Sequence, residues 1–550
     1  MAKSTGAVCG LWLMFVLAAV VLAAGPGPET VQPIYDGPEL DYQPSIIRVQ
    51  PGGQLMVVFE RIELPSFFGD LYVTLSGDGG ETWSTPAAIV ATPLNERHPS
   101  LLQLAAGSFV LFYLVDETGS GAYRLHRATS SDGVTWIDQG ALTLGWDTPG
   151  EINPNAILEA DGTLTMTYHR LSGPSYIARS TDDGATWDML KTQVSDGNAA
   201  LPRLTKRESD GLYLVTYQVN PGGNNLDLYA KVSTDPYDWS GPQIPVSTAI
   251  NTHDSQPIVL QGGTFLVAYA MTPVSYFDIF YRTSCDGVTW SDEVQVTHDA
   301  SHYDTQPHPL PHETPGRAIL TWSHQDGGTP YQDHDVWIDT SLDILPPTSA
   351  ILEPQEGQFI SDTTYLVSGV ATDTVSGVAG VAISVDGGPW QAAEGQASWT
   401  YLWEAYDEGA HNLRSRATDV AGHVEEPGLG VTVTVDSTPP ELVASSPVSG
   451  AIGVSLTAPV MLRFSEPVLH DTLGYSMAPD PGGWHVLWNV GWTESYLSHD
   501  GLLPGQTYTF TVSQARDRAR NPVAPAQWTF TTMSVEKHHH VYLPLLIKGE

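Results

Sequence analysis

The chain has 550 residues, enough for three or so domains, and a formal net charge of -39 with only 23 lysines and arginines. This balance argues against nucleic acid as a partner, because neutralising phosphates requires basic patches. Glycine (52 residues) and proline (41 residues) are frequent, and beyond the N-terminal leader no long segment has apolar residues at helical spacing. Many short strands, and so an all-β fold, are predicted.

The N-terminus has the pattern of a secretory signal peptide. Lys3 precedes an apolar run from Leu11 to Ala24, which is too short to span a membrane and ends in small residues. Residues 1–24 are therefore interpreted as a signal peptide. The protein is expected to be secreted or held at the cell surface, with no transmembrane helix in the mature chain.

A motif of the form S-x-D-x-G-x-T-W recurs downstream of the leader. Two copies are complete, two are one residue shorter, and a degenerate one ends at Trp239. Successive tryptophans follow at intervals of 53, 51, 52 and 51 residues, which indicates a repeat architecture with one supersecondary unit per repeat. Ser and Asp are expected to accept hydrogen bonds inside a tight turn, Gly to supply an unusual φ, and Trp to pack between sheets. The residues given this structural role are Ser76, Asp78, Gly80, Trp83, Ser130, Asp132, Gly133, Trp136, Ser180, Asp182, Gly184, Trp187, Ser284, Asp286, Gly287 and Trp290.

Six extended runs, each starting near a proline and ending in an aromatic residue, accompany this motif. They are Pro44–Phe59, Pro99–Tyr113, Pro154–Tyr168, Pro202–Tyr217, Pro257–Tyr269 and Pro307–Trp322. Most contain a glycine turn and predict strand, turn, strand; a third and a fourth strand flank the motif. Six four-stranded units over residues 33–344 predict a six-bladed β-propeller, whose last blade is completed by the segment around Gln32 to Asp36.

The repeat stops at Pro347, and two further units follow. Residues 348–436 and 438–533 each contain short alternating strands and fit one β-sandwich apiece, with Ser437-Thr438-Pro439-Pro440 as the boundary. Residues 534–550 are read as a C-terminal tail. The three histidines in this tail are interpreted as solvated, because no other ligands are spaced to complete a metal site.

The recurring turn resembles the Asp-box, or BNR repeat, of the sialidase superfamily, which implies a six-bladed propeller over residues 33–344. Residues 348–436 resemble a bacterial Ig-like module, notably in Val385-Asp386-Gly387-Gly388, and residues 438–533 resemble an SbsA-type Ig-like module through Phe464-Ser465-Glu466-Pro467. Such modules usually act as spacers or adhesive stalks.

The resemblance also implies a test for sialidase activity. Three arginines bind the sugar carboxylate in that family, because a guanidinium fork matches a carboxylate. The first belongs to a Tyr/Phe-Arg-Ile-Pro motif that opens the first blade. The matching place here reads Tyr42-Gln43-Pro44-Ser45-Ile46, without an arginine. Neither the other two arginines nor the family's nucleophile pair and acid can be assigned, which counts against sialidase activity.

Another pattern precedes the blade-opening prolines. Five of six blades read acid-x-polar-Pro, whereas the fourth has Ala199 and Leu201 in these places. Residues two apart on a strand point to the same side, so these pairs are expected to ring the mouth of the central channel. The acids are Asp41, Glu96, Glu151, Asp254 and Asp304, and the polar residues are Gln43, His98, Asn153, Gln256 and Gln306.

Two interpretations of this ring stay open. Each acid either ties down its own loop through backbone amides or faces a ligand. In the second case Glu151 and Asp304, on opposite sides of the ring, form the pair expected to do general acid and base work on a glycosidic bond.

The leading functional prediction is a secreted multidomain protein whose propeller binds carbohydrate or another cell-surface ligand without the arginine triad. One alternative is an exo-α-sialidase-type or other glycoside hydrolase, and another is a structural or adhesive cell-envelope protein. No cofactor is required by these readings. Calcium is the cation that such an acidic surface could bind, but the sequence pattern does not identify which residues would be its ligands.

Overall fold

The computed structural model describes residues 31–535 except 172, 198, 223–224, 249, 274–275, 299–300, 326–333 and 405–406. The predicted signal peptide, residues 1–24, and nearly all of the predicted tail lie outside the described residues. The chain divides into two compact units: the first runs to Pro346 and includes Asp373–Gly377 and Val420–His423, and the second contains the remainder. Within the described residues, no helix is long and apolar enough to cross a membrane.

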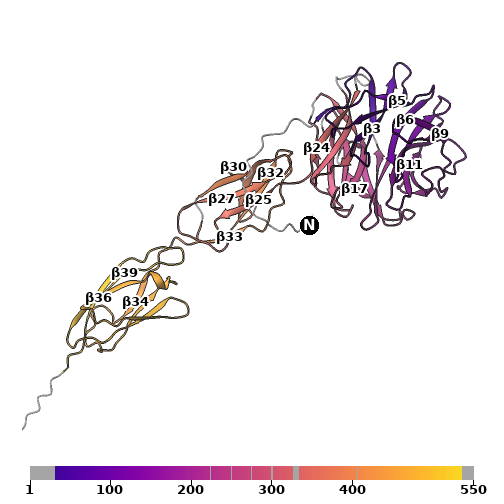
Figure 1. Ribbon diagram of the computed structural model, residues 1–550. Coiled ribbons are helices and arrows are strands. Elements are labelled where there is room, and N and C mark those ends of the chain that lie inside the picture. The colour runs from indigo at the N-terminus through magenta and orange to yellow at the C-terminus, as the bar shows by residue number, and fades with distance from the viewer. Residues whose placement is uncertain are drawn as a thin grey trace, which may run out of the picture. The chain divides into compact units, whose positions relative to one another are not determined.

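The strands of the first unit form four antiparallel sheets of four strands and one sheet of eight (Figure 1). The eight-stranded sheet comprises two antiparallel groups of four, which a parallel bridge between Leu40 and His334 joins, so we describe six blades. In chain order, the first five blades are β2 (Leu40–Arg48), β3 (Leu55–Glu63), β4 (Phe68–Ser76) and β5 (Ala87–Val90); β6 (Asn95–Gln103), β7 (Phe109–Asp116), β8 (Tyr123–Ser130) and β9 (Trp136–Ala141); β10 (Glu151–Leu158), β11 (Leu164–Arg170), β12 (Ser175–Ser180) and β13 (Thr192–Gln193); β14 (Ala199–Arg207), β15 (Leu212–Gly222), β16 (Asn225–Ser233) and β17 (Ile244–Ser247); and β18 (Thr252–Val259), β19 (Phe265–Met271), β20 (Asp278–Ser284) and β21 (Val294–Gln295). The sixth blade comprises β22 (Tyr303–Pro311), β23 (Arg317–Gln325), β24 (His334–Asp343) and β1 (Val31–Pro33).

Contacts between inner strands close these sheets into a ring. Each inner strand contacts the inner strand of the next blade, and β22 contacts β2. The N-terminal strand β1 pairs with β24, with Val31 opposite Asp339 and Pro33 opposite Trp337. The predicted propeller, with strands from both ends of its sequence in the last blade, is therefore confirmed.

The second strands of the blades are the most apolar, because neighbouring sheets cover both of their faces. All eight residues of β7 are buried. The tryptophans of the repeated turns extend this packing: Trp187 is 5% exposed and lies edge-to-face on Phe112 of the preceding blade, with 5.4 Å between ring centroids. Gly184 has a φ of 80°, and a Cβ there would lie 2.6 Å from Phe112. Only glycine fits this turn against the neighbouring sheet.

The second unit contains two β-sandwiches. The first has the sheets β25-β27-β31-β30 and β26-β33-β32-β28-β29, and the second has β34-β35-β38-β37 and β36-β39-β40. The bounds of the first are β25 (Thr348–Glu353), β26 (Phe359–Ile360), β27 (Thr364–Thr372), β28 (Val378–Val385), β29 (Gln391–Ala392), β30 (Glu394–Gly395), β31 (Ser398–Glu404), β32 (Gly409–Asp419) and β33 (Val431–Val435). Those of the second are β34 (Leu442–Ser446), β35 (Val460–Phe464), the 3-10 helix η1 (His470–Thr472), β36 (Gly474–Ala478), β37 (His485–Trp488), β38 (Glu494–Ser498), β39 (Thr507–Gln514) and β40 (Ala526–Thr531).

Candidate functional site

Every inner strand of the propeller carries a β-bulge near its start, at the end of the ring that we call the mouth. Its pairing with the second strand skips two residues, as between Tyr42 and Ser45 in β2. The first skipped residue has a φ between 49° and 57°, and in five blades the second is proline. Six equivalent non-glycine residues thus share a left-handed conformation, which the surrounding ring must hold in place. They are Gln43, His98, Asn153, Leu201, Asp254 and Gln306.

In the fifth blade the predicted register, with Asp254 as the acid and Gln256 as the polar residue, is wrong by two residues. The bulge of β18 lies between His253 and Gln256, so Asp254 occupies the left-handed position and Ser255 the proline position. Thr252 then stands where other blades have an acid. Aspartate tolerates the left-handed region better than most residues, because its short polar side chain can bond locally.

The remaining predicted acids are buried, and three of them lie directly opposite a basic residue on the second strand of the same blade. Glu151 and Asp304 are therefore each paired within their own blade, and neither lines the small cavity on the propeller axis, which we call the axial cavity. Such pairing is closer to the first interpretation of the ring, in which acids hold their own blade. The pairs are Asp41 with Arg61 (2.7 Å), Glu151 with Arg170 (2.8 Å) and Asp304 with His324 (2.6 Å).

Glu96 has no basic residue opposite it. Its strand partner is Val115, and its carboxylate is 1% exposed. Burial raises the pKa of Glu96 to about 7, although Thr92 donates a hydrogen bond to it, and the nearby Asp70 adds repulsion. Glu96 is thus a carboxyl group that can hold a proton near neutral pH.

Three arginines near the mouth are paired with carboxylates. Besides the two pairs above, Arg97 donates to Glu60 at 2.7 Å, and the same buried carboxylate accepts the backbone N–H of His98 at 2.9 Å. This bond joins the first blade to the second. One of the residues that line the axial cavity is an arginine, Arg203. Within the described residues, three arginines do not come together at the cavity.

The axial cavity has a volume of about 40 Å³ and lies where the bulges meet. By the usual allowance of roughly 10–15 Å³ for each water, it holds about three waters and is far too small for a sugar ring. Any carbohydrate must therefore bind outside it. The cavity is lined by Gln43, Pro44, His98, Pro99, Pro154, Asn155, Arg203, Asp254, Ser255, Gln256, Gln306, Pro307 and His308.

Aromatic and histidine side chains form two sets of ring contacts at the mouth of the fifth and sixth blades, and the neighbouring residues His302 and Tyr303 link the two sets in the chain. Ring centroids are 4.2 Å apart for His253 and Phe277, 6.3 Å for Phe277 and Tyr303, and 4.4 Å for His324 and Trp337. His253 also bonds Asp254 at 2.8 Å, which connects its set to the cavity wall. We call the two sets together the aromatic rim; its members are His253, Tyr276, Phe277, His302, Tyr303, His324 and Trp337.

The rim was not predicted from the sequence. Its members come from four strands and the segments between them, so no spacing within one repeat connects them. All except His324 are half-buried rather than fully enclosed. A sequence signal for the rim does exist, because Tyr, Phe and His are frequent in the fifth blade and in the first two strands of the sixth, which end at Gln325.

The repeated turns lie at the end of the propeller opposite the mouth, because each third strand runs away from the mouth into its turn. Their internal bonds recur from copy to copy. Ser180 donates to Asp182 at 2.8 Å, Gly184 N–H donates to Ser180 at 3.0 Å, and the indole of Trp187 donates to the Gly184 carbonyl at 3.0 Å. The predicted hydrogen bonding inside this turn is confirmed.

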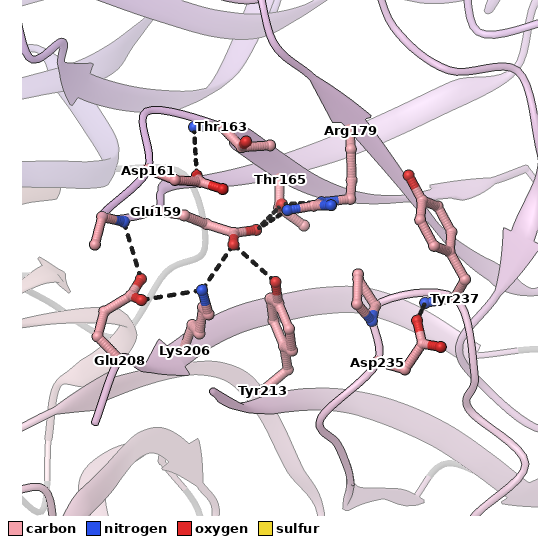
Figure 2. Close-up of polar contacts among 12 residues, drawn as sticks. Glu159, Asp161, Thr163, Thr165, Arg179, Lys206, Glu208, Tyr213, Asp235 and Tyr237 are labelled. Carbon is pink, nitrogen blue, oxygen red and sulfur yellow. Dashed lines mark hydrogen bonds and ion pairs between the residues drawn. The ribbon is translucent and has the colours of Figure 1, made fainter. Parts of the chain in front are cut away.

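A dense ion-pair network, also missed from the sequence, lies at that same end between the third and fourth blades (Figure 2). Glu159 accepts hydrogen bonds from Arg179 at 3.0 Å, from Lys206 at 2.8 Å and from the Tyr213 hydroxyl at 2.8 Å, and it also bonds Thr165. Burial alone would raise the pKa of Glu159, but these donors outweigh it and lower the pKa. A carboxylate held in this way is a poor base, so the network is structural.

Among the described residues of the second unit, three carboxylates lie close enough together to offer oxygen ligands to a cation. Carboxylate oxygens of Asp436, Glu466 and Asp517 all lie within 4.8 Å of one another. Burial, and then repulsion among neighbouring carboxylates, raise the pKa values of Asp436 and Glu466. Oxygen ligands of this kind suit calcium, but calcium binding stays a prediction.

Comparisons with known proteins cover all three domains. The BNR repeat-like domain family matches residues 39–205, the bacterial Ig domain family matches residues 347–414, and the bacterial Ig-like domain family matches residues 436–532. A search of curated proteins finds no match.

Solved structures that resemble the chain are distant in sequence. A protein of unknown function from Dyadobacter fermentans is 15% identical, with 56% of this chain and 98% of that chain covered and a TM-score of 0.46. The NanB sialidase from Streptococcus pneumoniae is 10% identical, with 58% and 70% covered and a TM-score of 0.44. The α-L-arabinofuranosidase of Fusarium graminearum is 14% identical, with 56% and 98% covered and a TM-score of 0.42. This chain thus carries a BNR repeat-like domain followed by two bacterial Ig-like domains, and its structural neighbours include sialidases and other propeller glycosidases.

Proposed function

We propose that the propeller binds carbohydrate at the aromatic rim and that the chain is a secreted protein presenting this site. The observation that carries the proposal is the grouping of half-buried rings beside a polar cavity at the mouth. Aromatic rings offer a large apolar surface at little entropic cost, and binding sites combine such surfaces with a few polar groups. Here Phe277 and Tyr303 supply the apolar surface, and His253 with Asp254 supplies polar groups.

The charges near the rim favour a neutral sugar. Arg61, Arg97 and Arg170 are engaged with carboxylates of the propeller. A carboxylate of a ligand at the rim would have to displace one of these pairs, because Arg203 lines the axial cavity, which is too small for a sugar. Asp304 beside the rim would also repel such a carboxylate. We infer neutral glycans as the ligand class.

The test is glycan-array binding of the full chain, followed by calorimetry with the best neutral glycan. Tyr303→Ala and Phe277→Ala are expected to weaken binding by about tenfold or more, as loss of a central aromatic contact does. Tyr237→Ala is the matched control, because Tyr237 is a 41% exposed aromatic residue in the turn after β16, at the end of the propeller opposite the mouth. Retention of no glycan, or equal loss in the control, would contradict the proposal and favour a structural or adhesive protein.

A glycoside hydrolase is the second candidate, and one contact favours it. Asp304 accepts from His324 at 2.6 Å and from the Trp322 indole at 3.0 Å. A carboxylate that orients an imidazole is a common general-base arrangement. The assay is hydrolysis of aryl glycosides and of a fluorogenic sialoside. Binding without catalysis predicts no release above background, whereas release that disappears in Asp304→Asn but persists in Glu151→Gln would assign the chemistry to this pair.

A further inference from the structure

Side chains just beyond the bulges connect neighbouring blades. Ser45 accepts the backbone N–H of Leu101 at 3.1 Å, and Ser100 accepts that of Ala156 at 3.0 Å. Asn155 likewise accepts the N–H of Leu204 at 2.7 Å. We call the position that supplies this acceptor the stitch position. It is occupied in chain order by Ser45, Ser100, Asn155, Arg203, Gln256 and His308.

The series of hydrogen bonds from stitch positions ends at Arg203, because neither Arg203 nor the residue that faces it can form this bond. A guanidinium has donors only, so Arg203 cannot accept an N–H. The residue that would donate from the fifth blade is Pro257, which has no N–H. The fourth blade therefore places a cation where the earlier blades place an acceptor, and no backbone donor is left unsatisfied by the change.

Arg203 faces the axial cavity with little compensation for its charge. Its hydrogen bond is from Nη1 to the carbonyl of Pro202, at 3.3 Å. Among the described residues no carboxylate lies within ion-pair distance of it, and Asp254 on the cavity wall is bonded to His253 at 2.8 Å. Burial lowers the pKa of Arg203 to about 10, and attraction to Asp254 opposes this only in part. Arg203 is half-buried, so its charge faces the cavity, where water or a small anion can bind to it.

Two histidines on the cavity wall are uncharged, and the cavity has space for a small partner of Arg203. Burial lowers the pKa values of His98 and His308 to about 4, so both rings are neutral near pH 7. His98 Nδ1 is buried and has no hydrogen-bond partner within the described part of the chain. The cavity volume of about 40 Å³ accommodates one halide-sized ion with a water or two.

We propose that the axial cavity binds one small inorganic anion, of chloride size, on the guanidinium of Arg203. The anion accepts hydrogen bonds from the Arg203 guanidinium, which lines the cavity. The cavity shares Asp254 with the proposed carbohydrate site, but its test measures halide binding and does not depend on carbohydrate binding.

Crystals of the full chain soaked in sodium bromide give a direct test. One anomalous bromide peak is expected in the cavity, within hydrogen-bonding distance of Arg203. In solution, the melting temperature at constant ionic strength is expected to rise saturably by about 2 °C or more when chloride or bromide replaces gluconate, which is too large for the cavity.

Two variants assign the effect to the site. Arg203→Met is expected to lose the halide effect, and Arg203→Lys, which retains the charge, is expected to keep part of it even if Met impairs folding. Arg124→Gln is the control, because Arg124 lies on the third strand of the second blade and does not line the cavity.

A cavity that contains only waters, or a rubidium or calcium peak there instead of bromide, would overturn the proposal. So would equal halide effects in Arg203→Met and the control. A bromide peak with no halide effect in solution would mean an adventitious ion only, and would also overturn it.

Discussion

Replacing Glu159 with glutamine tests whether the network between the third and fourth blades stabilises the ring. Glu159 is 3% exposed and bonds two cations and two hydroxyls. Glutamine keeps the volume but removes the charge that Arg179 and Lys206 face. Removing one partner of a buried ion pair costs about 3–5 kcal/mol. Lys206 keeps its contact with Glu208 at 3.0 Å and is partly solvated, so we expect a loss of about 2–4 kcal/mol.

The assay is urea unfolding of the propeller, followed by tryptophan fluorescence. The control is Asp210→Asn: Asp210 pairs with Arg207 at 2.7 Å, but its side chain is 48% exposed, so a loss below about 1 kcal/mol is expected. A Glu159→Gln variant no less stable than this control would refute the reasoning.

The same variant makes a prediction about pH. The folded-state pKa of Glu159 is lowered from 4.5, so its stabilisation is present above that value and is lost as the pH falls through the folded-state pKa. The stability difference between wild type and Glu159→Gln is therefore expected to shrink in acid. A difference that stays constant down to pH 3 would contradict the assignment.

Three further predictions concern other parts of the chain. The folded-state pKa of Glu96 is about 7, so ionisation destabilises the propeller as the pH rises from 4.5 through 7; Glu96→Gln should flatten this dependence and raise the melting temperature at pH 8. Deleting residues 1–37 removes β1, which should lower the melting temperature and cause association through the uncovered edge of β24, measured by light scattering. Asp436→Asn should raise the melting temperature of the second unit at pH 7 in the presence of a chelator, because it relieves repulsion with Asp517; a lower value would contradict this account.

The sequence was enough to predict the propeller because its fold depends on local and repeated signals. The tryptophan of each turn and the glycine before it recur at nearly constant spacing, and the closure by β1 follows from the missing fourth strand of the last blade. These features are set by backbone requirements, such as the positive φ of Gly184, that are the same in every blade.

The candidate site was less predictable because its features differ from blade to blade. Pro257 was a misleading marker in the fifth blade: the bulge, not the proline, sets the register, and Asp254 can hold the left-handed position without a following proline. The acids were expected at the channel mouth, yet a base lies opposite three of them on the second strand. That signal was present as a recurring separation of 19 or 20 residues, as from Asp41 to Arg61 and from Glu151 to Arg170.

Closure by β1 also has a consequence for the order in which the propeller can be completed. Val31 is among the first propeller residues to be synthesised, and its partner Asp339 is among the last. Contacts so distant in the chain are made late, because forming them costs the entropy of closing a very long loop. Five blades can thus pair their own four strands as they emerge, while the sixth waits with the outer edge of β24 uncovered. The first strand synthesised is the last to be put in place.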